Sequence, residues 1–302
     1  ESYIIKTIDD RPKKIDGIDK IEILIINDGS TDNTLEVVKN KKVNHIVSYS
    51  KQKGLAYAFS AGLNKCLELG ADIIVNTDAD NQYQGRYIKD LVSPIIKNES
   101  DISIGVRDTN AIEHFSAIKK FLQKIGSRVV MYLSGTSVSD ATSGFRAFSK
   151  DAAMRLNRYN SYTYTLDTII QAGYKNIIIS TTPIETNPDL RPSRLVTSTF
   201  RYVIRNAIGI IRIFLIYRSF QTIFYTGFIL FFAGFLLGLR YIYLIFIFDG
   251  GSGNIQSLIL SAILLTSGFV SFLAAILADK ISTIRQILEE KTYKINKILF
   301  KK

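Results

Sequence analysis

Two long apolar stretches near the end of the chain constrain its fold more than any other feature. Residues 220–248 and 255–278 are almost wholly apolar, and each is long enough to cross roughly 30 Å of hydrocarbon as a helix. Only six residues, Asp-Gly-Gly-Ser-Gly-Asn at 249–254, separate them. Because neither stretch has a polar face to turn toward water, a buried soluble helix pair is disfavoured. We therefore predict a transmembrane hairpin over residues 219–278.

The distribution of charge supports this division of the chain. Residues 1–190 carry 24 Lys and Arg against 23 Asp and Glu, whereas residues 191–302 carry 14 against 4. A basic surface for DNA or RNA is expected on a folded domain, and the near-neutral soluble part therefore disfavours a nucleic-acid partner. The hairpin loop has no Lys or Arg. The positive-inside rule thus predicts a multi-pass protein of the cell membrane, with the soluble part and the C-terminus in the cytoplasm.

The first 195 residues alternate between predicted strands and helices. Strand patterns run over residues 21–26, 45–49, 73–77, 102–106 and 177–183. Helical patterns run over residues 33–40, 55–69, 85–97 and 115–134. This alternation predicts an α/β domain with a mostly parallel, Rossmann-like sheet that is covered on both faces. Because the chain opens at Glu1 directly in a helix-like segment, we also expect a preceding strand to be missing from this sequence.

Two carboxylates one residue apart follow the apolar run 73–75. Asp78 and Asp80 are therefore expected at the carboxyl edge of a strand, which is where open α/β sheets bind ligands. Carboxylate oxygens are hard ligands that suit Mg²⁺ or Mn²⁺. The pair predicts a divalent metal that binds a diphosphate.

Two other turns in the first half carry polar residues. Asp28 lies in the turn 27–34, where a carboxylate at the sheet edge can accept hydrogen bonds from a ribose or a base. Taken alone, this turn is better explained as a plain turn followed by a helix cap. Lys53 lies in the turn 51–56 before a predicted helix, where lysines and backbone N–H groups can meet phosphate oxygens.

Five segments together resemble a known enzyme family. They are Asn27-Asp28-Gly29-Ser30, Lys53-Gly54-Leu55-Ala56, the Thr-Asp-Ala-Asp-Asn-Gln run at 77–82, Gly105-Val106-Arg107 and the Asp-Ala-Thr-Ser-Gly-Phe-Arg run at 140–146. Their order and spacing resemble family 2 glycosyltransferases of the GT-A fold, and more narrowly the polyprenyl-phosphate (dolichyl-phosphate) hexosyltransferases. The resemblance covers residues 1–195, and the membrane hairpin extends it in architecture. The family's first strand, with its Pro-x-Tyr-Asn-Glu motif, is missing before Glu1.

The resemblance implies a role for each matching residue. It implies that the nucleotide sugar donor is bound by Asp28, Lys53, Asp78, Gln82 and Asp140. It implies that the metal cofactor, Mg²⁺ or Mn²⁺, is held by Asp78, Asp80 and Gln82. Catalysis would fall to Asp80, Arg107 and Arg146. The acceptor phosphate would be bound by Arg107, Lys119, Lys120, Arg191 and Arg194.

The residues between the soluble part and the hairpin form a pattern of their own. On a helix, Arg201, Arg205 and Arg212 fall within roughly one 40° stripe, while Ile and Phe spread over the rest. Residues 196–218 are therefore predicted to form a basic amphipathic helix in the lipid headgroup layer, and an ordinary linker helix is the alternative. Residues 279–302 repeat apolar residues at helical spacing between lysines. They are predicted to form a cytoplasmic amphipathic tail, which leaves a homo-oligomer open.

A phosphate acceptor agrees with these residues. A sugar hydroxyl usually needs a general base, whereas a phosphate monoester, with a second pKa of about 6, is already anionic at neutral pH. The motifs contain arginines and lysines but no histidine. We therefore expect an inverting, metal-dependent enzyme at the cytoplasmic membrane face. It would transfer a hexose from a nucleotide diphosphate sugar to a polyprenyl phosphate, such as dolichyl or undecaprenyl phosphate.

Two alternatives stay open at this point. The first keeps the fold but changes the acceptor to a hydroxyl of a lipid-linked sugar or a polysaccharide, with Asp140 as the candidate base. The second is a degenerate, non-catalytic protein anchored in the membrane. The sequence does not fix the sugar, the nucleotide or the length of the lipid.

Overall fold

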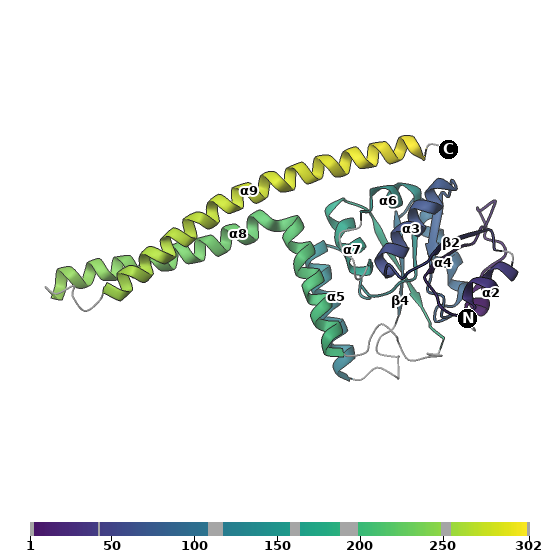
Figure 1. Cartoon of the computed structure of the whole chain (residues 1–302), viewed down its shortest axis with the longest axis horizontal. Helices are drawn as coiled ribbons and strands as arrows, with labels where there is room; N and C mark the ends of the chain where they lie inside the picture. The colour runs from purple at the N-terminus through teal and green to yellow at the C-terminus, as the bar shows by residue number, and fades with distance from the viewer. Residues whose placement is uncertain are drawn as a thin grey trace. The chain divides into compact units, whose positions relative to one another are not determined.

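The structure, a computed structural model, describes residues 3–41, 43–107, 117–157, 164–187, 199–248 and 255–300. It divides into two units (Figure 1). The first comprises residues 1–213 and 292–302, and the second comprises residues 214–291.

Strands and helices alternate along most of the first unit. The strands are β1 (Leu24–Asp28), β2 (His45–Tyr49), β3 (Ile73–Asn76), β4 (Ile102–Arg107), β5 (Arg146–Ser149) and β6 (Ile179–Ile184). The helices are α1 (Ile4–Asp9), α2 (Thr34–Asn40), α3 (Leu55–Glu68), the 3-10 turn η1 (Gly85–Tyr87), α4 (Ile88–Ile96), α5 (Ala117–Ser134), α6 (Lys150–Arg155) and α7 (Thr165–Tyr174). Two long helices, α8 (Thr199–Phe248) and α9 (Ile255–Leu299), each have residues in both units.

The strands form two sheets within the described residues. β1 and β2 pair in parallel, and the other four pair in the order β3-β5-β4-β6. β4 and β6 are parallel, whereas β5 is antiparallel to both β3 and β4. β3 and β4 therefore run in the same direction, and their carboxyl ends lie at one edge of the sheet. The predicted α/β class is confirmed, while β5, α6 and α7 were not among the predicted elements.

Helices cover both faces of the four-stranded sheet. Adjacent residues of a strand point to opposite faces, and β5 shows this with Ala147 and Phe148. Ala147 belongs to a buried cluster with Leu91 and Ile95 of α4, whereas the ring of Phe148 lies 5.6 Å from that of Phe59 on α3. The sheet is therefore a central layer between α4 and α3, as expected for an α/β domain.

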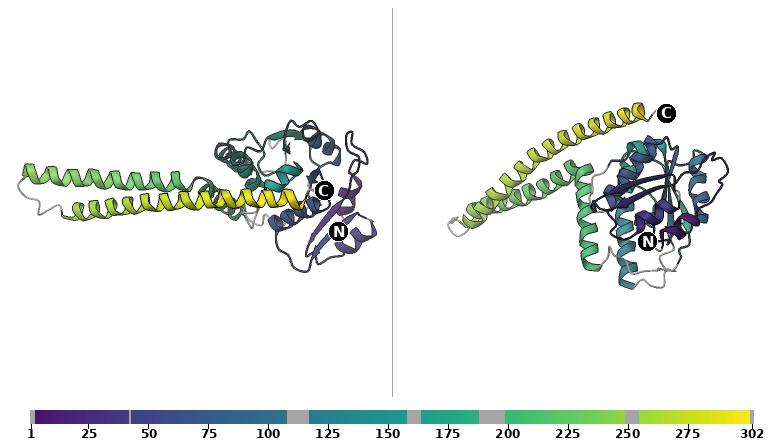
Figure 2. Two further views of the ribbon diagram at one scale, coloured as in Figure 1. Left: turned by 90° about the horizontal axis from the view of Figure 1, so that it is seen from above. Right: turned by 45° about the vertical axis from the view of Figure 1, so that its right-hand side comes forward.

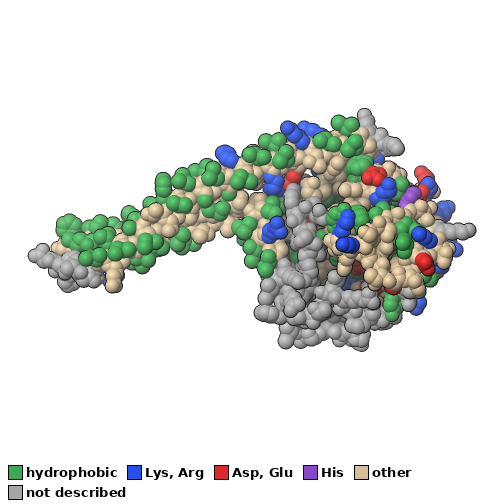
Figure 3. All heavy atoms as spheres, viewed as in Figure 1, with side chains coloured by type: hydrophobic (Ala, Val, Ile, Leu, Met, Phe, Trp, Pro, Cys, Tyr) green, Lys and Arg blue, Asp and Glu red, His purple; other side chains and the backbone are tan. Residues whose placement is uncertain are grey.

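The second unit is a pair of long apolar helices, whose courses can be followed in Figure 2. Two segments, Leu215–Ile247 and Ile255–Leu299, are long and apolar enough to cross a membrane. Only 6% and 17% of their most apolar windows are buried, so they do not serve as the core of a soluble fold. Figure 3 shows hydrophobic side chains along their visible face. The backbone of α8 departs from helical geometry at Arg218 (φ −127°, ψ 33°), the last residue of the predicted interfacial segment.

A seam of small residues joins the two helices of the second unit. Its buried positions on α9 are Ser261, Gly268 and Ala275, which are seven residues apart. A Cβ placed on Gly268 would lie 2.7 Å from the backbone nitrogen of Phe231, so this approach requires glycine. Across the seam, the Ser261 hydroxyl donates a 2.6 Å hydrogen bond to the carbonyl of Gly234. Close backbone packing at small residues is typical of helix pairs in membranes.

The end of α9 folds with the first unit. The Tyr293 hydroxyl donates a hydrogen bond to the carboxylate of Asp151 on α6, and the Arg155 guanidinium lies 4.9 Å from the centre of the Tyr293 ring. The side-chain amide of Asn296 donates to the carbonyl of Met154 at 3.2 Å. The sequence predicted an amphipathic tail over residues 279–302 from its helical periodicity. That periodicity did not reveal that the last turns of α9 pack against the α/β domain.

Candidate active site

One edge of the four-stranded sheet gathers several of the predicted site residues. Asp78 follows the end of β3 by two positions, Arg107 ends β4, and Arg146 begins the antiparallel strand β5. Asp28 ends β1 of the other sheet. The carboxyl edge of parallel strands is the usual place for a ligand in an α/β fold, and the directions of β3 and β4 place this group there.

Asp28 holds the turn that begins α3. Its two carboxylate oxygens accept hydrogen bonds from the backbone N–H groups of Lys53 and Gly54, each at 2.8 Å. The ammonium of Lys53 lies 4.2 and 4.5 Å from the ring centres of Tyr49 and Tyr57. Asp28 therefore positions the lysine turn, and its contact with a nucleoside stays a prediction.

Asp80 orders the loop that follows β3. Its Oδ1 accepts a 3.1 Å hydrogen bond from the backbone N–H of Gln82, and Asn81 between them has a left-handed φ of 57°. The backbone and side-chain amides of Asn187 donate to the carbonyls of Gln82 and Asn81 at 2.9 and 2.8 Å. The loop is thereby tied to the segment after β6, while Asp78 and Asp80 stay partly exposed.

Asp78 and Asp80 suit a cation that is bound partly by the protein and partly by a substrate. Among the described residues, no group of three or more His, Cys, Asp or Glu is placed to enclose a metal ion. A metal on Asp78 and Asp80 would therefore complete its shell with phosphate oxygens and water, which is how Mg²⁺ is commonly bound. Carboxylate ligands suit Mn²⁺ as well. Gln82 as a further ligand stays a prediction.

Arg107 and Asp140 form a buried ion pair. The Nε of Arg107 lies 2.7 Å from Oδ2 of Asp140, and the two side chains are 10% and 1% exposed. The Thr142 hydroxyl accepts from Nη2 of Arg107 and donates to Oδ1 of Asp140. Burial would raise the pKa of Asp140, but the Arg107 guanidinium and the Thr142 hydroxyl hold it below its ordinary value. Asp140 is therefore ionised at neutral pH and is a weak general base.

This pairing changes the roles expected for the two residues. Both oxygens of Asp140 are engaged and the side chain is buried, so it orients Arg107, and its assigned contact with the donor stays a prediction. The Nη1 of Arg107 has no hydrogen-bond partner in the part of the chain that the structure describes. That nitrogen is the one left for an acceptor phosphate, which stays a prediction.

Arg146 lies in the core, which corrects its assignment to catalysis. It is 0% exposed. Its guanidinium donates to the carbonyls of Ala141, Ser143 and Thr165 and to the hydroxyl of Thr168. Burial lowers the pKa of Arg146 to about 10, so it stays protonated at neutral pH. Its side chain therefore joins the segment before β5 to α7 and positions that segment without reaching a substrate.

Four residues that were predicted to bind the acceptor phosphate have side chains that the structure does not describe. Arg191 and Arg194 are outside the described residues. Lys119 and Lys120 lie in the first turn of α5, where the backbone is described and the side chains are not.

Sequence reasoning missed the side chains beside Asp78. Tyr83 and Tyr164 are each 4% exposed, and both hydroxyls bond the backbone of Gly144. Tyr83 directly follows the 77–82 motif, so its position was visible in the sequence. Tyr164 directly precedes α7, and the packing of that helix brings it there.

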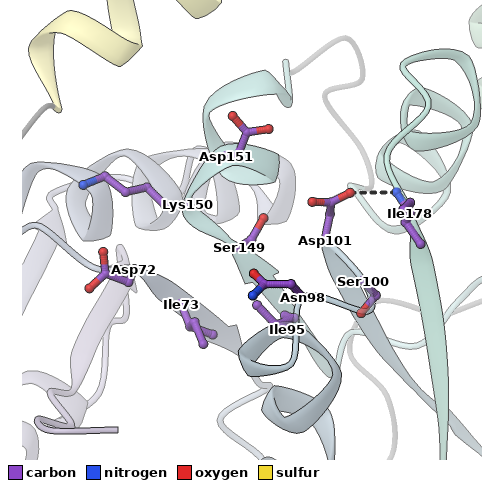
Figure 4. Close-up of a pocket in the computed structure, with 10 residues that line it drawn as sticks. All are labelled: Asp72, Ile73, Ile95, Asn98, Ser100, Asp101, Ser149, Lys150, Asp151 and Ile178. Atoms are coloured by element: carbon purple, nitrogen blue, oxygen red, sulfur yellow. Dashed lines mark hydrogen bonds between the residues drawn. The ribbon is translucent and has the colours of Figure 1, made fainter. Parts of the chain in front are cut away.

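The described residues also line a cavity of about 350 Å³ at the opposite edge of the sheet. Figure 4 shows Asp72, Asp101 and Ser149 around it. Asp72 precedes β3, Asp101 precedes β4 and Ser149 ends the antiparallel β5. These positions place the cavity away from Asp78, so it does not belong to the candidate active site.

The sequence is similar to a known family and to several known proteins. The sequence model described as "Glycosyl transferase family 2" matches residues 1–156. The chain is 32% identical over 185 residues to the UDP-N-acetylglucosamine–dolichyl-phosphate N-acetylglucosaminyltransferase of Methanococcus voltae, a match that covers 54% of this chain and 74% of that protein. It is 25% identical over 165 residues to the undecaprenyl-phosphate mannosyltransferase of Micrococcus luteus, covering 53% and 64%.

Solved structures share the fold. Glucosyl-3-phosphoglycerate synthase from Mycobacterium tuberculosis, in complex with Mn²⁺, UDP-glucose and phosphoglyceric acid, superposes with a TM-score of 0.54. The match covers 70% of this chain and 75% of that one at 18% identity. The same enzyme with Mg²⁺ and UDP superposes with a TM-score of 0.52. The predicted GT-A class is confirmed at the level of fold.

Proposed function

Because the chain belongs to glycosyl transferase family 2, we propose that it transfers a hexose from a nucleotide diphosphate sugar to a polyprenyl phosphate. The reaction inverts the anomeric centre, uses Mg²⁺ or Mn²⁺ and takes place at the cytoplasmic face of a membrane. Relatives named as dolichyl-phosphate and undecaprenyl-phosphate transferases support the acceptor.

The buried Arg107–Asp140 ion pair is the observation that most supports a phosphate acceptor over a hydroxyl acceptor. Asp140 was the candidate base for a hydroxyl acceptor, but the pair lowers its pKa and occupies both of its oxygens. An acceptor that brings its own negative charge, as a phosphate monoester does at neutral pH, does not need Asp140 as a base, which supports a phosphate acceptor. Arg107 supplies a fixed positive charge at the end of β4 to meet it, because its arginine side chain stays protonated.

We place the donor at the same edge of the sheets, next to the Asp78 and Asp80 loop. We assign the nucleoside to the Asp28 and Lys53 turn and the diphosphate to the Asp78 and Asp80 loop. A divalent metal held there would neutralise charge on the departing diphosphate. The acceptor phosphate attacks the anomeric carbon from the opposite face, which inverts the configuration. In this scheme Lys119, Lys120, Arg191 and Arg194 add positive charge around the acceptor.

The acceptor is tested by the chemistry of the product. The purified full chain is incubated with Mn²⁺, labelled UDP- and GDP-sugars and undecaprenyl phosphate, and the lipid fraction is treated with mild acid. We expect labelled lipid that mild acid cleaves, because a protonated phosphate leaves the anomeric carbon readily and the alcohol of an ordinary glycoside does not. Undecaprenol without phosphate is the matched control and should stay unlabelled. A product that resists mild acid would show a hydroxyl acceptor.

We also propose the arrangement in the membrane. Residues 1–195 form the catalytic domain, residues 196–218 an interfacial helix, residues 219–278 the hairpin and residues 279–302 a cytoplasmic tail. The low burial of both apolar segments and the small-residue seam between them support the hairpin. The positive charge of both flanks supports a cytoplasmic catalytic domain.

Cysteine labelling tests this orientation. The chain has one cysteine, Cys66, so single cysteines are introduced in a Cys66→Ser background as Ser252→Cys in the hairpin loop and Lys301→Cys at the end. We expect a membrane-impermeant maleimide to label the loop variant in intact cells and the terminal variant only after lysis. The reverse pattern would place the catalytic domain outside.

A further inference from the structure

The carboxylate of Asp78 rests against a glycine. A Cβ placed on Gly144 would lie 3.1 Å from Oδ2 and 3.4 Å from Oδ1 of Asp78. It would also lie 2.9 Å from the hydroxyl of Tyr164. A side chain at position 144 would have to displace the Tyr164 hydroxyl and the Asp78 carboxylate. The carboxylate of Asp78 thus packs close to Gly144, and a shift of this glycine would change the space available to it.

Two tyrosines hold this glycine from opposite sides. The Tyr83 hydroxyl accepts a 3.1 Å hydrogen bond from the N–H of Gly144, and the Tyr164 hydroxyl donates to its carbonyl at 3.4 Å. The side-chain amide of Asn76 donates to the same carbonyl and to the Tyr164 hydroxyl, both at 2.8 Å. The glycine is therefore bonded through both of its backbone polar groups and is linked to the end of β3, two residues before Asp78.

The rings of both tyrosines are fixed by stacking. Tyr164 lies on Phe59 of α3 with ring centres 3.8 Å apart and planes at 9°. Tyr83 lies on Phe145 at 5.1 Å and 11°. Two rigid, neutral hydroxyls of this kind can hold a backbone segment in one place.

We propose that Tyr83 and Tyr164 are positioning residues for Asp78. Through Gly144 they fix its carboxylate in the orientation in which it meets the divalent cation and the donor diphosphate. This inference rests on the proposed function, because it takes Asp78 as part of the metal and diphosphate site. The tyrosines act through the glycine, as outer partners of a metal ligand commonly do.

Mn²⁺ affinity in a double-mutant cycle tests the proposal. Binding of Mn²⁺ to the purified full chain with UDP is followed by electron paramagnetic resonance of the free ion, for Tyr164→Phe, Tyr83→Phe, Asp78→Asn and each tyrosine variant combined with Asp78→Asn. We expect each single tyrosine variant to raise the Kd for Mn²⁺ by about tenfold. Combined with Asp78→Asn, the tyrosine changes should add little, because their effect passes through Asp78.

The controls separate positioning from loss of structure. Tyr132→Phe changes a tyrosine that is 81% exposed on α5 and should leave the Kd unchanged. The melting temperature of every variant is measured beside the Kd. The inference is overturned if both tyrosine variants leave the Kd unchanged, or if their effects multiply fully with that of Asp78→Asn. If Asp78→Asn itself binds Mn²⁺ as the parent does, the metal site of the proposed function is wrong, and this inference with it.

Discussion

Replacement of Asp80 with alanine is expected to lower kcat/KM for sugar transfer by about 10²–10³-fold, the usual loss when a group that stabilises developing charge is removed. The departing nucleotide gains negative charge as the bond to the sugar breaks, and Asp80 is one of the two acids that we assign to the neutralising cation. The described residues offer no third acid, cysteine or histidine to take its place in a metal group. Formation of labelled lipid at saturating Mn²⁺ measures the loss.

Two further variants show whether the charge of Asp80 or its loop contact matters. Asp80→Asn keeps an oxygen to accept the hydrogen bond from Gln82, now 3.1 Å to Oδ1, and removes only the negative charge. We expect it to lose nearly as much activity as Asp80→Ala. Asp72→Asn removes an exposed carboxylate just before the same strand, at the opposite edge of the sheet, and should retain activity. An active Asp80→Asn enzyme would contradict the assignment of Asp80 to a cation.

The sequence predicted correctly the strand ends at which the candidate residues leave the sheet. An apolar run followed by Asp78 and Asp80 predicted a strand with acids at its carboxyl end, and β3 ends at Asn76 as this requires. Arg107 was placed at the end of a strand by the same reasoning, and it ends β4. In both cases the local pattern determines where the side chain leaves the sheet.

The burial of a side chain was not predictable from strand ends. Arg146 follows a motif that resembles catalytic segments, but alternation along β5 points it to the same face as Phe148, against α7. Neither β5, with four residues, nor the short helix α6 has enough length for a periodic pattern. Two of the four acceptors of Arg146, Thr165 and Thr168, lie on α7. Tyr164, which lies beside Asp78, directly precedes that helix, and only tertiary packing brings this part of the chain close.

The buried position of Arg146 leads to a second large effect, on stability. Arg146→Met is expected to lower the free energy of unfolding by about 3 kcal/mol, because the change leaves buried carbonyls and a hydroxyl without their donor at roughly 1–3 kcal/mol each. Part of that loss is offset because the buried charge is removed as well. For a domain of this size, the melting temperature should fall by roughly 10 °C. Thermal unfolding of the purified chain, followed by circular dichroism, measures the shift.

Activity then distinguishes a positioning role from a catalytic one. If Arg146 only holds the segment before β5, the variant should keep measurable transfer activity at temperatures below its melting transition. On heating, that activity should decline in step with the folded fraction. Arg128→Met is the matched control, because this arginine of α5 is exposed and a surface charge contributes little to stability. A variant of Arg146 that melts like the parent and has lost transfer would return this residue to catalysis. Because all four acceptors of its guanidinium belong to the chain itself, we expect the stability loss instead.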